Sequence, residues 1–161
     1  MAVSSRTSRR AGVALVVGAT LAVSGCAAAE LPTYETVTEE ATAAMQRVVD
    51  EMPPGSRVAL QPGSDPYGCE GDGVFYTGHW GVYPGPGFDG QAFVDHLPSA
   101  LGDEFVVQDR VVKLIMPSVG FTATTYGNAG LDVTVVDVDG TTVVDILAIS
   151  RCAQPSATPA P

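Results

Sequence analysis

The segment from Thr33 to Met52 repeats its apolar residues at steps of three and four positions. This spacing predicts an amphipathic helix with one buried stripe. Thr33 is a suitable N-cap, and the acidic residues after it suit the positive end of the helix dipole. The turn sequence at 53–55 (Pro-Pro-Gly) ends the helix. The expected buried stripe comprises Tyr34, Val37, Ala41, Ala44, Met45, Val48 and Met52.

A second helix is expected from Asp89, as its N-cap, through Leu101. Pro98 lacks an N–H donor and crowds the carbonyl of Val94, so we expect it to break or kink this helix. Gly102 then provides a C-terminal stop. The expected buried stripe comprises Ala92, Phe93, either His96 or Leu97, and Leu101.

The other apolar segments are short, alternate with polar residues and are separated by glycine and proline, which is typical of strands. A turn-rich loop at 61–73 follows the first of them, and a Gly-Asn-Ala-Gly turn at 127–130 separates two later ones. The expected strands cover residues 57–60, 74–83, 105–108 with an extension over 111–116, 119–126, 131–138 and 141–150.

Asp139-Gly140 is the clearest hairpin signal in the chain, because both residues suit a two-residue turn. Such a turn makes the numbers of paired residues sum to 279. One face of the hairpin is then apolar throughout, with the pairs Leu131–Ala148, Val133–Ile146 and Val135–Val144. The opposite face is mixed. Since a slip of one residue would break this sorting, we expect the apolar face to be core.

These elements predict one α+β domain over residues 33–152. The expected architecture is a two-layer sandwich, in which an antiparallel sheet of five or six strands carries both helices on one face. Residues 27–32 form a tether that spans at most about 20 Å when extended. Residues 153–161 (AQPSATPAP) have little to bury and are expected to be a disordered tail.

Residues 1–26 have the layout of a secretory signal peptide. Three arginines precede an uninterrupted apolar run of 13 residues, Ala11 to Val23. A spanning helix needs about 20 residues, so this run is too short to be one. The run leads into Val23-Ser24-Gly25-Cys26, which looks like a bacterial lipobox. We therefore expect Cys26 to carry a lipid (palmitate among its acyl chains); a plain signal peptide with an incidental cysteine is the alternative. Both the general secretory route and the twin-arginine route stay open.

Charge changes the picture of possible partners. Three of the 8 basic residues precede Cys26 and all 18 acidic residues follow it, so the chain from Cys26 onward has a formal net charge of −13. Such a domain is repelled by nucleic acid and by anionic headgroups. We therefore expect no nucleic-acid partner. The expected partners are the membrane, through the lipid on Cys26, and an envelope protein or a small ligand.

Once Cys26 is acylated, Cys69 and Cys152 are the two thiols left. Export exposes them to an oxidising compartment, where disulfides persist, and two cysteines allow one pairing. A Cys69–Cys152 bridge would place residue 152 beside the start of the 74–83 strand. That strand would then neighbour the 141–150 strand. Two free buried thiols are the alternative.

The 74–83 strand is rich in aromatic residues. Alternation places Val74, Tyr76, Trp80 and Val82 on one face, and Phe75, Thr77, His79 and Tyr83 on the other. If the first face is core, then Phe75, His79 and Tyr83 form a half-exposed patch that can hold a ligand or sugar ring. The alternative is that a loop or helix covers this patch.

Catalytic and metal motifs give no comparable signal. The chain has two histidines, and His96 reads as a surface or boundary residue. Asp65, Glu70 and Asp72 lack the ligand spacing of a calcium loop and are explained by turn chemistry. We therefore assign no catalytic residue, no metal ligand and no cofactor.

The order of features resembles small uncharacterised lipoproteins of actinobacteria. A lipobox and an acidic helix are followed by Cys69, by the aromatic run Tyr76-Thr77-Gly78-His79-Trp80, by a second helix, and by a hairpin that ends in Ser150-Arg151-Cys152. The resemblance implies membrane anchoring and a disulfide and carries no activity. We expect a non-enzymatic binding or interaction module, lipid-anchored on the extracytoplasmic side of the cell membrane. The alternative is a small-molecule or lipid carrier with a cavity between helices and sheet.

Overall fold

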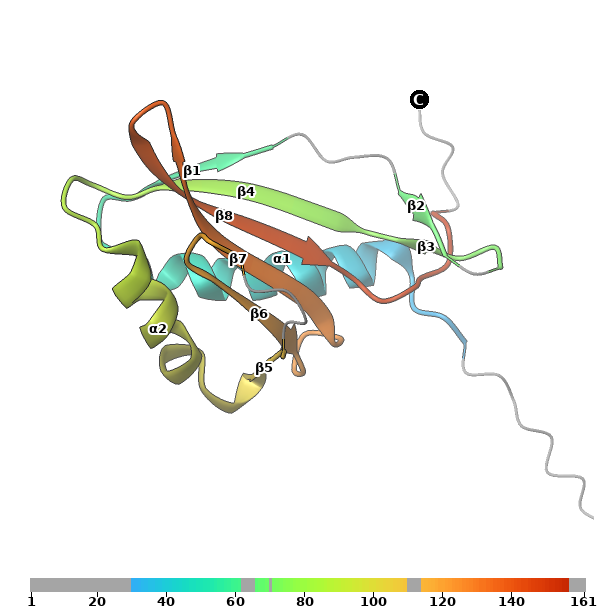
Figure 1. Cartoon of the computed structure of the whole chain (residues 1–161). Helices are drawn as coiled ribbons and strands as arrows, with labels where there is room; N and C mark the ends of the chain where they lie inside the picture. The colour runs from blue at the N-terminus through green and yellow to red at the C-terminus, as the bar shows by residue number, and fades with distance from the viewer. Residues whose placement is uncertain (1–29, 62–65, 70, 110–113, 157–161) are drawn as a thin grey trace, which may run out of the picture.

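The computed structural model describes residues 30–61, 66–69, 71–109 and 114–156 (Figure 1). Its helical elements are α1 (Tyr34–Asp50), α2 (Gly90–Leu101) and the short 3₁₀ turn η1 (Gly102–Glu104). Its strands are β1 (Arg57–Leu60), β2 (Tyr67–Gly68), β3 (Val74–Phe75), β4 (Thr77–Tyr83), β5 (Phe105–Val107), β6 (Ser118–Ala123), β7 (Ala129–Val138) and β8 (Thr141–Ile149).

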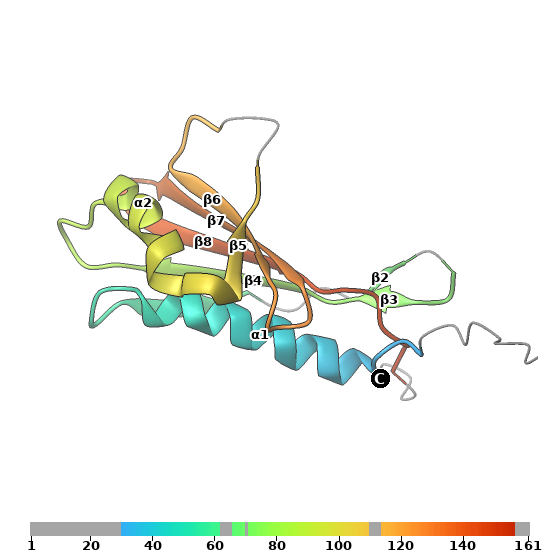
Figure 2. The same ribbon diagram turned by 90° about the horizontal axis from the view of Figure 1, so that it is seen from below.

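Within these described residues, six strands form one sheet in the order β1-β4-β8-β7-β6-β5. Every neighbouring pair in this sheet is antiparallel, and β2 and β3 form a separate small hairpin. α1 packs against β4, β7 and β8, and α2 packs against β5, β6 and β7. Figure 2 shows α1 lying along one side of the strands. The predicted α+β architecture is confirmed.

α1 follows its predicted course closely. The Thr33 side chain accepts a hydrogen bond from the backbone N–H of Thr36 (3.2 Å), which is the expected N-cap. The helix ends at Asp50, shortly before the predicted proline stop. Tyr34 is half-buried, while the rest of the predicted stripe is buried: Val37, Ala41, Ala44, Met45, Val48 and Met52.

α2 begins as predicted, because Asp89 Oδ1 accepts a hydrogen bond from Ala92 N (3.0 Å). The prediction that Pro98 breaks the helix is wrong, since α2 continues through it to Leu101. Only one turn remains after the proline, and Leu97 and Leu101 hold that turn against the core at 1% and 2% exposure. Gly102 ends the helix as expected, with a positive φ of 65° that favours glycine.

The predicted stripe of α2 needs a correction at two positions. Val94 is buried and Ala92 is exposed, so the stripe begins with Val94 and not with Ala92. Of the two candidates in the next turn, Leu97 is buried and His96 is exposed. Phe93 is half-buried and packs against the rim of the core.

The β7–β8 hairpin has the predicted register. Asp139 and Gly140 adopt positive φ angles of 52° and 77°, and Asp137 Oδ1 accepts a hydrogen bond from Gly140 N (2.8 Å). The three predicted apolar pairs are confirmed, and each of their residues is at most 8% exposed: Leu131–Ala148, Val133–Ile146 and Val135–Val144.

Other strands differ from their predicted bounds. The expected strand at 74–83 is interrupted at Tyr76, whose N–H donates to the Ser150 hydroxyl (2.9 Å) while its carbonyl accepts from the Ser150 backbone N–H (2.9 Å). The strand predicted at 119–126 runs from 118 to 123, because residues 124–128 form the turn before β7. Residues 111–113 of the proposed strand extension lie outside the described residues, and 114–116 form a bend.

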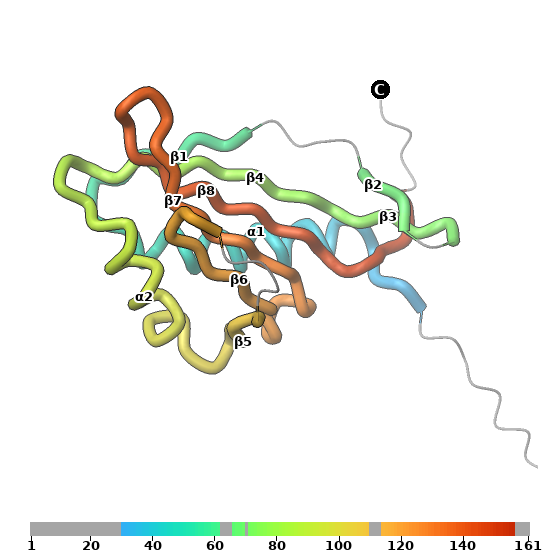
Figure 3. Tube along the Cα trace, in the orientation of Figure 1, coloured from blue at the N-terminus to red at the C-terminus, as the bar shows by residue number. Residues whose placement is uncertain are grey.

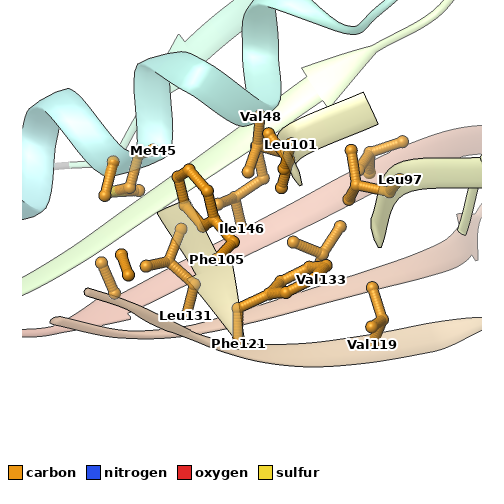
Figure 4. Packing of buried hydrophobic residues seen from close by; sticks show 14 of the residues in the cluster. Met45, Val48, Leu97, Leu101, Phe105, Val119, Phe121, Leu131, Val133 and Ile146 are labelled. Atoms are coloured by element: carbon orange, nitrogen blue, oxygen red, sulfur yellow. The ribbon is translucent and has the colours of Figure 1, made fainter. Parts of the chain in front are cut away.

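The core fills the space between the helices and one face of the sheet (Figure 4). Met45 and Val48 of α1 and Leu97 and Leu101 of α2 meet side chains that rise from the strands. Phe105 and Phe121 pack edge to face, with ring centroids 6.0 Å apart. The labelled strand residues in this cluster are Phe105, Val119, Phe121, Leu131, Val133 and Ile146.

The C-terminal segment is structured beyond the predicted limit at residue 152. Ala153 is fully buried and pairs with Val74, and Gln154 pairs with Thr33. Ordered structure therefore reaches two residues into the segment expected to be a tail. The sequence signal is weak here because the pairing uses backbone groups and one small side chain.

Candidate functional site

Cys69 and Cys152 form the predicted disulfide, with their Cα atoms 6.1 Å apart. The bridge lies beside the Val74–Ala153 backbone pair, so it fastens the β2–β3 hairpin to the C-terminal segment. Figure 3 shows these two segments side by side at one end of the molecule. β4 pairs with β8, which confirms the strand order inferred from the bridge.

The two faces of the sheet are covered differently. Trp80 and Val82 of β4 point into the core under the helices, as alternation predicts. Their neighbours along β4 point to the opposite face, on which no helix of the described chain packs. We call this second surface the open face. Strand register extends it across β8, because Thr77 pairs with Ile149, His79 with Leu147, and Gly81 with Asp145.

A hollow of about 410 Å³ lies on the open face at the end nearest the disulfide. It contains two of the three residues of the predicted patch, Phe75 and His79, both half-buried. Its apolar walls include Leu147 and Ile149, which are 42% and 53% exposed. The full lining is Gln61, Tyr67, Phe75, Thr77, Gly78, His79, Leu147, Ala148 and Ile149.

The β2–β3 hairpin forms the aromatic wall of the hollow. Tyr67 and Phe75 are directly paired across this hairpin, and their rings stack with centroids 5.6 Å apart and planes 18° apart. Tyr67 is 52% exposed, so the stacked pair presents an aromatic surface to solvent. The disulfide at Cys69 holds this wall near the sheet.

His79 contributes an imidazole ring to the hollow. Its Nε2 lies 2.5 Å from Asp145 Oδ1 of the neighbouring strand, and both side chains are partly exposed. When the imidazole is protonated, this contact is an ion pair. The carboxylate therefore orients the ring and leaves Nδ1 for another partner. Gln61 directly follows β1, and its backbone N–H donates to the His79 carbonyl (3.0 Å).

Tyr83, the third residue of the predicted patch, lies on the same face but does not line the hollow. The guanidinium carbon of Arg57 lies 4.1 Å from the centre of the Tyr83 ring. Arg57 and Tyr83 are paired across β1 and β4, which brings the two side chains onto the same face. The ring is thereby engaged in a cation–π contact four residues beyond His79, the last residue of β4 that lines the hollow.

Several residues that line the hollow were not predicted from the sequence, among them Tyr67, Leu147 and Ile149. The last two were predictable, because the hairpin register places them opposite the apolar face and the disulfide places β8 beside β4. Combining these two inferences would have set Leu147 beside His79. Tyr67 gave no signal, because a two-residue strand inside a turn-rich loop has no periodicity to recognise.

The remaining candidate chemistry is not brought together. Cys26, Asp65 and Glu70 lie outside the described residues. Within the described ranges, no three His, Cys, Asp or Glu side chains gather as a metal site requires. His96 Nδ1 lies 3.3 Å from Ser99 Oγ on the exposed side of α2, but that hydroxyl also donates to the His96 carbonyl (2.7 Å).

No helix in the described part of the chain is both long and apolar enough to cross a membrane. Comparisons with protein-family models, with curated proteins and with solved structures find no match to this chain. The site therefore has to be interpreted from its own geometry.

Proposed function

We propose that this chain is a lipid-anchored protein of the cell envelope whose α+β domain is a non-enzymatic binding module. It belongs with the small actinobacterial lipoproteins that its order of features resembles. The observation that carries the binding role is the hollow on the open face, where Phe75 and His79 lie with exposed apolar residues of β8. Exposed apolar groups gathered in one depression favour a ligand or partner that covers them.

The anchoring part of the proposal rests on the sequence around Cys26. Two acyl chains hold a protein on a bilayer stably, whereas one chain gives reversible attachment. The disulfide supports an exported location, because such bridges persist in oxidising compartments. The protein would then face the extracytoplasmic side of the membrane.

The packing favours a surface module over a carrier with an internal cavity. Side chains of both helices and of the sheet form one continuous core cluster in the space that a carrier cavity would need. The hollow lies on the other side of the sheet and is lined partly by exposed residues. A binding role at the surface therefore requires no opening of the fold.

Anchoring is tested by Cys26→Ala in the full chain. Because the modified thiol would be lost, we expect the variant to leave the membrane fraction or to accumulate unprocessed. The measurement is fractionation after a high-salt wash, with the mass of the N-terminal peptide. Cys69→Ala with Cys152→Ala is the matched control, since it removes thiols without touching the lipobox. A processed Cys26→Ala variant that stays on the membrane would contradict the anchor.

Binding is tested by placing a photoreactive residue in the hollow of the full chain. Phe75→p-benzoylphenylalanine should give cross-linked adducts on irradiation of intact cells. Val138→p-benzoylphenylalanine is the control, because Val138 is 53% exposed and lies at the far end of β7. Equal adduct yields at 75 and 138 would show that the hollow has no preferred occupant.

A further inference from the structure

The start of the described chain is joined directly to the aromatic wall of the hollow. Gln154 donates its backbone N–H to the carbonyl of Pro32 (2.8 Å), and Ala153 is paired with Val74 of β3. Leu31 packs over Gly73, where an added Cβ would lie 3.5 Å from Leu31 Cδ1. Figure 1 shows this first segment, the C-terminal segment and the β2–β3 hairpin together at one end of the molecule.

This junction limits how far the hollow can lie from a lipid on Cys26. Leu31 is five positions after Cys26, and five residue steps of extended chain reach about 17 Å. The headgroup layer of a bilayer takes up about 5–8 Å of that distance. Leu31 and the hairpin would then lie within roughly 10 Å of the membrane surface. Leu31 is 42% exposed and adds an apolar side chain on this side.

The polarity of the hollow changes along its length. The end nearest the tether is formed by the stacked rings of Tyr67 and Phe75 and by Ile149. One step further along the strands, Leu147 lies beside His79, and the Asp145 carboxylate lies beyond it. The hollow is therefore apolar toward the membrane and polar away from it. A lipid in the outer leaflet has the same order, with its chains toward the bilayer and its headgroup outward.

We propose that the ligand of this hollow is a membrane lipid, drawn partly out of the leaflet to which the protein is anchored. This inference rests on the proposed function. One acyl chain would lie against Phe75, Leu147 and Ile149, and the headgroup would reach His79. A headgroup without net negative charge is favoured, because Asp145 faces this end and the chain from Cys26 onward has a net charge of −13.

The test uses the full lipoprotein reconstituted in phosphatidylcholine vesicles that contain a small fraction of phosphatidylcholine with a photoactivatable diazirine on one acyl chain. After irradiation and proteolysis, mass spectrometry locates the adducts. We expect adducts on the peptides that contain Tyr67, Phe75 and Ile149. The double variant Leu147→Thr with Ile149→Thr should reduce these adducts at least tenfold, because it removes apolar contact with the acyl chain. Threonine is chosen because it is favoured in strands, so β8 should be retained.

Val138→Thr is the matched control, because Val138 is on the open face, has the same 53% exposure as Ile149 and lies outside the hollow. It should keep the wild-type yield. Equal yields from wild type and the double variant, or adducts confined to other peptides, would overturn the lipid assignment. An unchanged melting temperature shows that the double variant is folded, and Leu147→Ala serves as the milder variant.

The same experiments separate failure of this inference from failure of the proposed function. If position 75 cross-links to a protein or a soluble compound in cells while vesicle lipid gives no adduct, then the hollow is a binding site and only the lipid assignment is wrong. If position 75 gives no adduct in either experiment, then the binding role itself is wrong. Cys26→Ala tests the anchor independently of both.

Discussion

Side chains alternate between the two faces of the sheet, and the two faces differ in how far these side chains are buried. On the helix-covered face, Ile146 is fully buried and belongs to the core cluster. On the open face, the next residue, Leu147, is 42% exposed and lines the hollow. The comparison teaches that adjacent apolar residues on one strand meet opposite environments: Ile146 stabilises the core, whereas Leu147 is left on the surface for which we propose a binding role.

The largest expected effect comes from Ile146→Ala. Truncating a fully buried isoleucine leaves a cavity and should lower the free energy of unfolding by about 2–5 kcal/mol. Leu147→Ala is the adjacent control and should change it by less than about 1 kcal/mol, because its side chain is partly solvated already. Urea unfolding of both variants measures the difference. Equal losses would mean that the open face is covered in solution.

The second largest loss of stability is expected from removing the disulfide. It closes a loop with a sequence separation of 83 residues. Replacing both cysteines by serine should lower the free energy of unfolding by about 2–4 kcal/mol, because the unfolded chain regains conformational freedom. The aromatic wall should loosen at the same time, which amide hydrogen exchange at 67–75 would report. Protection in this hairpin that stays at the wild-type level would show that its backbone pairs alone hold the wall.

Two glycines of β4, one on each face of the sheet, allow the packing of the two faces to be compared directly. A Cβ at Gly78, on the helix-covered face, would lie 2.6 Å from Met45 Sδ, within the packed core. A Cβ at Gly81, on the open face, would make an ordinary contact of 3.5 Å with Val143. We expect Gly78→Ala to cost about 1–3 kcal/mol by overpacking. Gly81→Ala should stay within about 0.5 kcal/mol of wild type. Thermal unfolding checks both, and the reverse order would contradict the assignment of faces.

The smallest effect is expected outside both faces, at Glu35 in the first turn of α1. A backbone hydrogen bond lowers the pKa of this carboxyl from its ordinary value of 4.5, and a hydrogen bond from Ser156 contributes. A lowered folded-state pKa stabilises the fold above the ordinary value, and this contribution is lost as the pH falls through the lowered pKa. Glu35→Gln should therefore lower Tm slightly at neutral pH and not in strong acid. Glu39→Gln on the same helix controls for the lost charge.

The prediction of the elements succeeded where one periodicity dominated. The stripe from Val37 to Met52 and the pairing across Asp139-Gly140 each repeat a simple spacing, and the structure confirms both. The expectation that Pro98 breaks α2 failed because it considered only the backbone of one residue. Leu97 and Leu101 are buried on either side of that proline, and tertiary packing keeps the last turn helical.

The candidate site was predicted in part. Alternation placed Phe75 and His79 on the face away from the core, and both lie in the hollow. Tyr83 shares that face but lies under Arg57, a partner set by the pairing of two strands. Alternation assigns a side chain to a face, but it does not say which neighbour covers the side chain there.

The sequence by itself determined helix α1, the start of α2, the register and core face of the long hairpin, and the one possible pairing of Cys69 with Cys152. These depend on local spacing, on turn chemistry and on a count of thiols. Only the tertiary structure decided that Tyr67 meets Phe75, that Asp145 meets His79, and that the chain enters beside the apolar end of the hollow. Those contacts join segments far apart in the chain, and their geometry depends on how the strands are ordered and packed.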